Sequence, residues 1–387
     1  MKKSTPRMVK MMNRELVIQE LRKNPKQSRA DLSKQTKLSK PTISEIVREL
    51  IEEEIIYETG YGPSTGGKKP MYLMYNTCFC YVIGTLIEND TVFFALGDMD
   101  GNIIHITQQD FSPQTEAEKM IDMIFTGITH LLEHEQVPFE KIIGIVLGVS
   151  GIKMDSNEII ESSPTIQWGN LHVREELINR LQKPVIIEND VNLMTIGEYY
   201  KGQAKDIDNF VYLFIGNGIG SGLFLNGEFY KGYHSASGEI GFMMVGNEHQ
   251  KKKDLGVFET NYGLMGILYR LKKIASTVEK TYDYSILKYL QRNKHNPEIR
   301  DLLNDVIHHW ALAAINIISI VDPQAIIISG ELENMDYESF EQFSQTIRTY
   351  VPKMPEIKMT KLGYKAGIYG ALHLALDQFH ITGFKYK

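Results

Sequence analysis

The pattern of the chain changes near residue 77, and this change restricts the fold more than any other feature of the sequence. Before it, short amphipathic segments precede a glycine-rich stretch. After it, apolar stretches typical of strands alternate with longer helical segments. The predicted strands cover 81–86, 92–98, 103–108, 142–148, 185–188, 210–215, 222–225 and 325–329, and the predicted helices cover 115–133, 173–181, 191–200, 254–273 and 298–321. Such alternation predicts an α/β architecture with mixed sheets. The 387 residues also exceed the length of about 250–300 residues at which single domains stop growing, so we expect two or three domains.

Three short helices are predicted at the start of the chain. Apolar spacing indicates the first helix over residues 13–23. Ser28, with Asp31 three residues later, has the pattern of a capping box for the second. Ser39 is a plausible N-cap of the third, with Pro41 in its first turn, where the missing N–H costs nothing. The short turn before the third helix predicts a helix-turn-helix motif.

A β-hairpin follows the three helices. Residues 55–58 and 71–75 are apolar and β-prone, and the stretch 60–67 between them is rich in Gly, Pro and Ser. Lys68 and Lys69 lie at its tip, where a wing that contacts the minor groove or the DNA backbone needs cations. The alternative is an ordinary solvated hairpin.

The charge distribution indicates which part of the chain meets a polyanion. Residues 1–76 carry 15 Lys and Arg against 9 Asp and Glu, a net charge of +6, whereas the remainder carries 27 against 39, a net charge of −12. A basic N-terminal segment on an acidic body favours nucleic acid as a partner of that segment alone.

In a helix-turn-helix the second helix of the motif enters the major groove and presents residues near its N-terminus to bases and phosphates. Cationic side chains there can meet phosphate or guanine, and short hydroxyl side chains can donate and accept hydrogen bonds. The alternative is a helical hairpin that contacts only protein. We predict that DNA is contacted by Ser39, Lys40, Thr42, Ser44, Arg48, Lys68 and Lys69.

The cysteines and the lack of long apolar runs indicate in which cellular compartment the protein is found. The two cysteines, Cys78 and Cys80, are separated by one residue on a predicted strand and make a poor disulfide, which fits a reducing cytoplasm. We see neither the apolar core of a signal peptide nor a run of about 18 apolar residues. We therefore expect a cytoplasmic protein without membrane association.

Three runs in the acidic body could bind a ligand. The glycine-rich run 216–222 follows a strand, and its backbone N–H groups could cradle a phosphate, although such a run can equally be a tight turn between strands. Asn189 and Asp190 end another predicted strand, and Glu239 follows the glycine-rich run. Their side chains offer acceptors suited to sugar hydroxyls.

The order of these motifs resembles the ROK family (repressors, open reading frames, kinases), and specifically its winged-helix repressors. The resemblance covers nearly the whole chain. It is carried by the helix-turn-helix with Gly66-Gly67-Lys68-Lys69-Pro70, Leu147–Gly151, Ser163-Pro164 with Trp168 and Asn170, Glu188–Asn192, Gly216–Gly222 and Asp322–Ile328.

The resemblance implies a winged helix-turn-helix followed by an actin-like pair of α/β lobes with the ligand in the cleft between them. We expect the DNA-binding domain over 1–76, the first lobe over 77–190 and the second lobe over 191–387. The helix at about 366–380 is expected to return to the first lobe.

The family's sugar site implies which residues face the ligand. Phe242 stands where the family has a histidine that helps bind the sugar. The phenylalanine lacks that hydrogen-bond donor, and its aromatic face could stack on a sugar or fill the pocket. For Glu259 the alternative is a solvated helix start. The expected sugar-facing residues are Asn189, Asp190, Glu239, Glu259, Ser150, Gly151 and Phe242.

The structural zinc site of the family is expected to be absent. Family members commonly place a histidine after Glu-x-Gly and then a cysteine-rich run, and the histidine and three thiolates bind zinc. Here Phe242 takes the place of the histidine, and residues 247–254 contain no cysteine. Two lone histidines, His234 and His249, do not make a site, so we predict no metal and no cofactor.

Kinase activity is also not expected. The family's kinases take the hydroxyl proton with an aspartate that corresponds to Asp190, so this residue would be a vestigial base. Their Asp-x-Gly-x-Thr phosphate loop is replaced here by residues 83–91, in which bulky Leu86 and Ile87 and acidic Glu88 disfavour ATP.

Three hypotheses therefore stand. The first is a dimeric repressor of carbohydrate-utilisation genes that a sugar such as xylose releases from its operator. The second is a sugar kinase with an accessory DNA-binding arm. The third is a repressor that no longer senses sugar.

Overall fold

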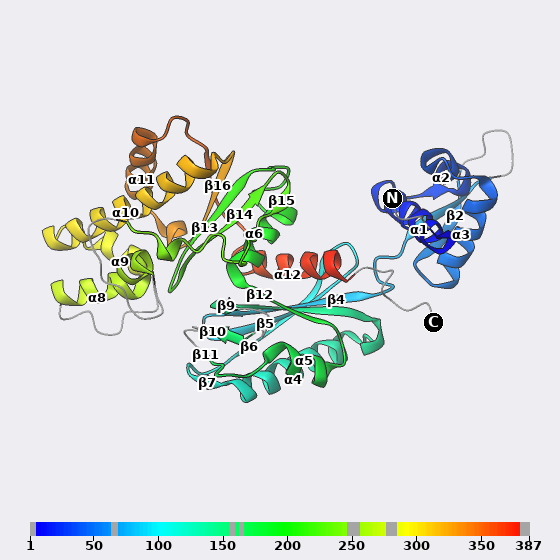
Figure 1. The fold of residues 1–387 in the computed structure, drawn as a ribbon, viewed down its shortest axis with the longest axis horizontal. Helices are drawn as coiled ribbons and strands as arrows, with labels where there is room; N and C mark the ends of the chain where they lie inside the picture. The colour runs from blue at the N-terminus through cyan, green and yellow to red at the C-terminus, as the bar shows by residue number, and fades with distance from the viewer. Residues whose placement is uncertain are drawn as a thin grey trace.

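The computed structural model describes residues 5–62, 69–154, 159–161, 166–245, 256–275 and 285–379. A small N-terminal domain lies beside two α/β lobes, and a C-terminal helix lies between the lobes (Figure 1). The N-terminal domain contains a three-stranded sheet, and each lobe contains a five-stranded sheet. None of the described helices is long and apolar enough to cross a membrane.

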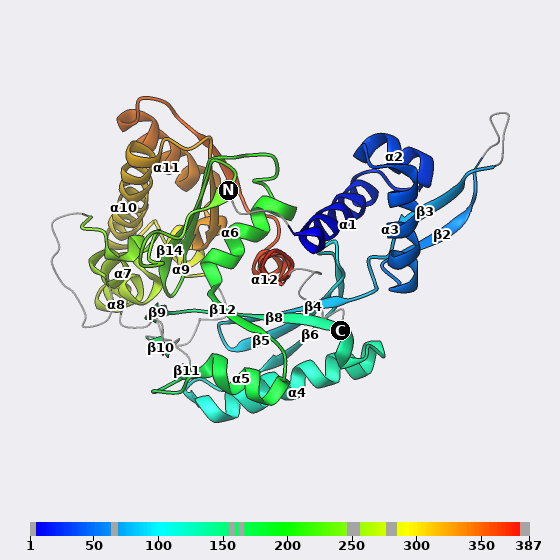
Figure 2. The same ribbon diagram turned by 45° about the vertical axis from the view of Figure 1, so that its right-hand side comes forward.

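The N-terminal domain is the predicted winged helix-turn-helix. Its elements are α1 (Pro6–Lys23), β1 (Gln27–Ser28), α2 (Arg29–Thr36), α3 (Lys40–Glu52), β2 (Ile56–Tyr61) and β3 (Met71–Tyr75). The strands are antiparallel in the order β1-β3-β2. Val17, Leu32 and Val47, one from each helix, share a core with Leu73 of β3. Figure 2 shows β2 and β3 extending away from the body.

Local hydrogen bonds explain where α2 and α3 begin. The predicted capping box of α2 is confirmed, because Asp31 N donates to Ser28 Oγ at 3.3 Å and Ser28 N donates to Asp31 Oδ2 at 3.0 Å. Ser39 caps α3, and Pro41 lies in its first turn, as predicted. Lys37 adopts the left-handed conformation that ends α2.

The first lobe is a mixed sheet with helices on both faces. Its strands, in spatial order, are β12 (Val185–Asn189), β8 (Ile142–Val149), β4 (Tyr81–Glu88), β5 (Thr91–Gly97) and β6 (Ile103–Asp110). One face packs against α4 (Ala117–Glu135) and α5 (Val173–Leu181), and the other packs against α12 (Lys365–Gln378). Short strand pairs join β7 (Thr115–Glu116) to β11 (Ile166–Gln167) and β9 (Ile152–Met154) to β10 (Ile159–Glu161). The five predicted main strands are confirmed.

The second lobe pairs its sheet with a helical layer. Its strands, in spatial order, are β15 (Glu228–Phe229), β14 (Ile219–Leu225), β13 (Phe210–Ile215), β16 (Ala325–Gly330) and β17 (Glu356–Met359). Its helices are α7 (Val257–Tyr262), α8 (Leu264–Ile274), α9 (Ile286–Arg292), α10 (Pro297–Val321) and α11 (Tyr337–Tyr350). Trp310 of α10 belongs to the hydrophobic core that these helices form with one face of the sheet, and its Nε1 donates to Tyr262 O at 3.0 Å.

Three sequence predictions differ from the structure. The first helix begins at Pro6 rather than near residue 13, because the Thr5 side chain caps it and a proline in the first turn needs no N–H partner. The single helix predicted over 254–273 is wrong within the described residues, since α7 and α8 are separate helices that meet at Gly263. Cys78 and Cys80 lie in the turn before β4 rather than on a strand.

Helix α6 (Asp190–Lys201) and α12 cross in backbone contact between the lobes. A Cβ at Gly197 would lie 1.9 Å from Ala366 O, and a Cβ at Gly370 would lie 1.8 Å from Leu193 O. No larger residue fits at either position without moving a helix. Because α6 contacts β14 and α12 contacts β4, this helix pair touches the sheets of both lobes.

The N-terminal domain is joined to the first lobe by a folded contact. Arg22 at the end of α1 donates to Asp100 Oδ1 at 2.9 Å and to Met99 O at 3.1 Å, both in the turn between β5 and β6. Its guanidinium also lies 5.6 Å from the ring centroid of Tyr75, which packs edge-on against Phe79. The cores of the domain and the lobe are therefore continuous.

Candidate functional site

The second helix of the motif, α3, presents three of the predicted DNA-contacting residues along one face, whereas Thr42 lies on the side toward α1. Lys40, Ser44 and Arg48 follow at four-residue intervals and are exposed, and Thr42 is half-buried. Nothing in the described part of the chain forms an ion pair with Lys40 or Arg48, so both cations can reach phosphate or guanine. Ser39 has a structural role as well, because its Oγ accepts from Thr42 N at 3.3 Å.

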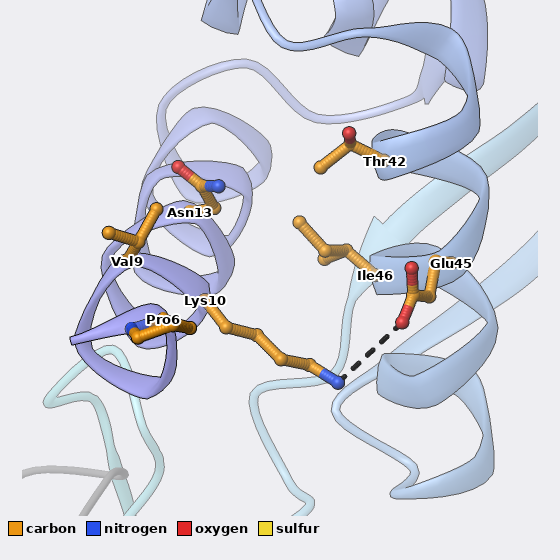
Figure 3. Close-up of a pocket in the computed structure, with 7 residues that line it drawn as sticks. All are labelled: Pro6, Val9, Lys10, Asn13, Thr42, Glu45 and Ile46. Carbon is orange, nitrogen blue, oxygen red and sulfur yellow. Dashed lines mark ion pairs between the residues drawn. The ribbon is translucent and has the colours of Figure 1, made fainter.

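The orientation of α3 is fixed by ion pairs with α1. Lys10 Nζ donates to Glu49 Oε1 at 2.6 Å and lies 3.8 Å from Glu45 Oε1, and Arg14 donates to Glu49 and Glu53. Figure 3 shows Lys10 reaching toward Glu45 across a groove of about 420 Å³. The groove is lined by Pro6, Val9, Lys10, Asn13, Thr42, Glu45 and Ile46. These cations offset acidic charge that would otherwise oppose DNA next to the contacting face.

The strands β2 and β3 form the predicted wing. Tyr61 pairs with Met71, and Gly62 N donates to Pro70 O at 2.8 Å, so the pairing continues to the edge of the described residues. Lys69 is exposed next to this pair. Lys68 lies outside the described residues, and its DNA contact stays a prediction.

Replacing Lys68 and Lys69 together with alanine should weaken DNA binding and lower its salt dependence. Each lysine that neutralises a phosphate contributes about one unit to the slope of log K against log salt, so we expect a decrease of up to about two units. Fluorescence anisotropy over a salt series measures the slope. The matched control replaces Lys205 and Lys353, two exposed lysines of the body. An unchanged slope in the wing variant would remove the wing from the interface.

The predicted ligand residues of the first lobe meet where β8 and β12 end. These strands are parallel neighbours, with Asn189 opposite Val149, so the loop after β8 lies beside the start of α6. Asn189 Nδ2 donates to Gly151 O at 3.3 Å, and its Oδ1 accepts from Asn192 N at 3.2 Å as the cap of α6. The structure thus brings Asn189 and Gly151 together, with half-buried Ser150 in the same loop.

Carboxylates from both lobes interact electrostatically in this region. Burial, with the nearby carboxylates of Glu88 and Glu239, raises the pKa of Asp190 to about 7. Burial and the neighbouring Glu259 raise the pKa of Glu239, and burial raises the pKa of Glu259. Burial and then Glu333 raise the pKa of Glu88, whose Oε2 has no hydrogen-bond partner among the described residues. We refer to the region formed by these five residues as the interlobe site.

The glycine-rich run is a tight turn between two strands. Ile215 pairs with Ile219, and Gly216 N donates to Gly218 O at 2.8 Å, which confirms the turn interpretation. Ile219 N donates to Glu259 Oε2 at 2.8 Å. One N–H that a phosphate cradle would use is therefore already occupied by a carboxylate.

Sequence reasoning missed an ion pair next to this site. Lys231 Nζ donates to Glu188 Oε2 at 2.6 Å, and Asn192 Nδ2 donates to Glu188 Oε1 at 3.0 Å. Although burial opposes ionisation, Lys231 and these hydrogen bonds hold the pKa of Glu188 below its usual value. Glu333, also missed, accepts from Gly330 N at 2.9 Å. No local pattern identifies the Lys231–Glu188 pair, because these residues are 43 positions apart in the sequence and meet only through the topology.

The remaining predictions concern Phe242 and zinc. Phe242 lies at the end of a short 3-10 turn, η2 (Ile240–Phe242), and is 43% exposed. His234 is exposed and packs edge-on against Tyr233. His249 and the cysteine-free stretch 247–254 lie outside the described residues, so the loss of the family's zinc site stays a prediction.

An exposed helix-turn-helix, a wing and a two-lobe α/β body together define a winged helix-turn-helix DNA-binding protein with an appended body. The body matches the model of the ROK family over residues 83–378, and residues 13–57 match a model of winged helix-turn-helix DNA-binding domains. The chain belongs to the ROK family.

Full-length relatives and solved structures agree with this assignment. The chain is 31% identical to the xylose repressor of Bacillus spizizenii, with 96% of each chain covered. The solved structure of a ROK-family transcriptional regulator, a homologue of the Escherichia coli MLC protein, has a TM-score of 0.75 over 95% of this chain and 96% of its own. A ROK glucokinase from Streptomyces griseus matches at a TM-score of 0.59, over 77% of this chain and 99% of its own. At 20% identity, both structures show the fold alone.

Proposed function

We propose that this protein is a transcriptional repressor of carbohydrate-utilisation genes that binds operator DNA as a homodimer and is released by a sugar such as xylose. The observation that carries the proposal is the similarity to a named xylose repressor across both the winged helix-turn-helix and the body. A dimer is expected because helix-turn-helix proteins usually engage two half-sites.

The sugar would lie among residues that belong to different lobes. Asn189 and Asp190 extend from the first lobe, whereas Glu239 and Glu259 belong to the second. Ser150, Gly151 and the aromatic face of Phe242 would complete the site. A sugar that binds both sets of residues favours the lobe arrangement in which they are closest, and only such differential binding can shift the population.

A contiguous set of contacts connects this site to the DNA-binding domain. Asp190 begins α6, and α6 crosses α12 in backbone contact. His373 of α12 lies against the β5–β6 turn, because a Cβ at Gly101 would be 2.6 Å from its ring. The same turn binds Arg22 of α1 through Asp100. A lobe movement would therefore reposition α1 and change the spacing of the two α3 helices in a dimer.

Sugar kinase activity is the enzyme alternative, and the raised pKa of Asp190, a base candidate, favours it. Two observations weigh against it. Glu88 ends β4 with a carboxylate oxygen that has no hydrogen-bond partner in the described part of the chain, in the stretch that the resemblance aligns with the phosphate loop of the kinases, and Glu259 accepts the hydrogen bond from Ile219 N. The ATP phosphates would meet anions at both places.

Three measurements test the proposal. Operator fragments bound to the protein should be released by one sugar among xylose, glucose and N-acetylglucosamine, and calorimetry should detect that same sugar. Sequence-specific DNA binding with no response to any of the three would favour a repressor that no longer senses sugar. Incubation with ATP and aldoses should form no ADP; turnover that Asp190→Asn abolishes would instead establish a kinase.

A further inference from the structure

A second polar cluster lies outside the interlobe site, on the first lobe. His105 belongs to the edge strand β6, and His134 and Glu135 form the end of α4. Glu135 Oε1 is 3.3 Å from His105 Nδ1 and 2.8 Å from His134 Nδ1, and the two imidazole rings are 4.6 Å apart. No other group of three His, Cys, Asp or Glu residues in the described ranges brings its ligand atoms within 4.8 Å of one another.

We propose that His105, His134 and Glu135 form a zinc-binding site. Two imidazoles and one carboxylate are a donor set that zinc accepts, with the fourth position left to water. Zn–N and Zn–O bonds of about 2.0–2.2 Å in tetrahedral geometry place neighbouring ligand atoms about 3.3 Å apart. The two separations from Glu135 Oε1 are close to this value, so small side-chain rotations would bring all three donors onto one ion.

The cluster is accessible to solvent. The side chains of His105, His134 and Glu135 are 34%, 64% and 22% exposed, so an ion can enter from solvent without unfolding. Without a metal, a single carboxylate oxygen faces both Nδ1 atoms. Each imidazole must then carry its proton on Nδ1 to donate, whereas a metal ion accepts a lone pair from both rings at once.

The position of the cluster suggests what a metal ion would do. β6 is the last strand of the sheet, and α4 ends at Glu135. A zinc ion shared between them would fasten the end of α4 to the unpaired edge and raise the stability of the first lobe by mass action. This site is separate from the family's cysteine-based one, and it departs from our expectation of a metal-free protein.

Calorimetric titration of the untagged full-length chain with zinc chloride, after treatment with a chelator, tests the site. We expect one zinc ion per chain and a higher melting temperature in its presence. His105→Ala and the isosteric Glu135→Gln should each weaken zinc binding at least about tenfold, because each removes one of three protein ligands. His308→Ala, which removes an exposed histidine from α10, should bind zinc like the wild type.

Three results would overturn the zinc site. Wild-type protein that binds no zinc at micromolar concentration overturns the proposal, as does zinc binding that neither His105→Ala nor Glu135→Gln weakens. Mg²⁺ binding with the same affinity would also overturn it, since Mg²⁺ prefers an all-oxygen octahedral site. Glu135→Gln keeps the side-chain shape, so the test holds even if His105→Ala folds poorly. None of these results depends on DNA binding or on a sugar effector.

Discussion

The Asp190→Asn variant should be more stable than the wild-type protein at pH 8. Burial and the carboxylates of Glu88 and Glu239 raise the pKa of Asp190 to about 7, so its ionisation at pH 8 destabilises the folded state. The unfolded chain loses this proton near pH 4. The loss of folding stability caused by this ionisation is therefore absent below about pH 4 and grows as the pH rises. It is complete above the pKa that Asp190 has in the folded protein. Asparagine removes it, with a gain of at most about 4 kcal/mol.

Urea unfolding at pH 5 and pH 8 measures this effect. The gain from Asp190→Asn should fall by more than half at pH 5, where Asp190 is protonated in the folded protein. Asp301→Asn, at an exposed position on α10, serves as the matched control for an aspartate-to-asparagine change. A variant that is less stable than the wild type at pH 8 would mean that the carboxylate is stabilised by contacts that asparagine cannot make.

The same substitution should remove the response to sugar. A hydrogen bond to a charged acceptor contributes about 1.5–3 kcal/mol, so at pH 8, where Asp190 is ionised, affinity for the proposed sugar effector should fall by roughly 10- to 150-fold while operator binding persists. Calorimetry with the effector measures the first quantity, and anisotropy measures the second. Unchanged sugar affinity would place the effector away from Asp190. The stability result stands independently, because it rests on burial and charge alone.

Removing both free cations of α3 should have the largest effect on DNA binding. A side chain that contacts a base or phosphate there contributes about 1–3 kcal/mol, so Lys40→Ala with Arg48→Ala should lower operator affinity about 30-fold or more. Both side chains are exposed and unpaired within the ranges that the structure describes, so the melting temperature should not change. Thr42→Ala or Ser44→Ala should instead change which operator sequences are preferred.

Anisotropy with an operator fragment and with an unrelated duplex separates these effects. Loss of phosphate contacts weakens binding to both duplexes. Loss of base contacts instead reduces the difference between the affinity for the operator and the affinity for the unrelated duplex. Lys205→Ala with Lys353→Ala again serves as the control in the body. Full operator affinity in the α3 variant would indicate a helical hairpin that contacts only protein.

Features encoded within a few residues were predictable from the sequence. The caps at Ser28 and Ser39 depend on side chains that meet the next turn, and the main strands are apolar runs of ordinary length. The first half of α1 was missed: the helix begins there because of the Thr5 cap and the proline in its first turn, and its Met8 and Met12 side chains are exposed rather than packed.

Contacts between distant segments could not be predicted in this way. Lys231 and Glu188 are 43 residues apart, and Glu333 interacts with Glu88 from the opposite lobe. The same holds for His105 and Glu135, which meet because β6 lies beside the end of α4. Motif order pointed to Asn189 and Gly151, which the structure brings together, but partners that the topology brings together are visible only in three dimensions.

The folded junction at Arg22 limits how this protein can be re-engineered. A DNA-binding domain on a flexible linker can be exchanged as a module, but this one shares a core with the first lobe through Tyr75 and Phe79. A chimera that joins a foreign winged helix to this body would lose that core and the Arg22–Asp100 pair. New operator specificity should therefore be grafted onto the exposed face of α3, leaving α1 and the wing strands in place.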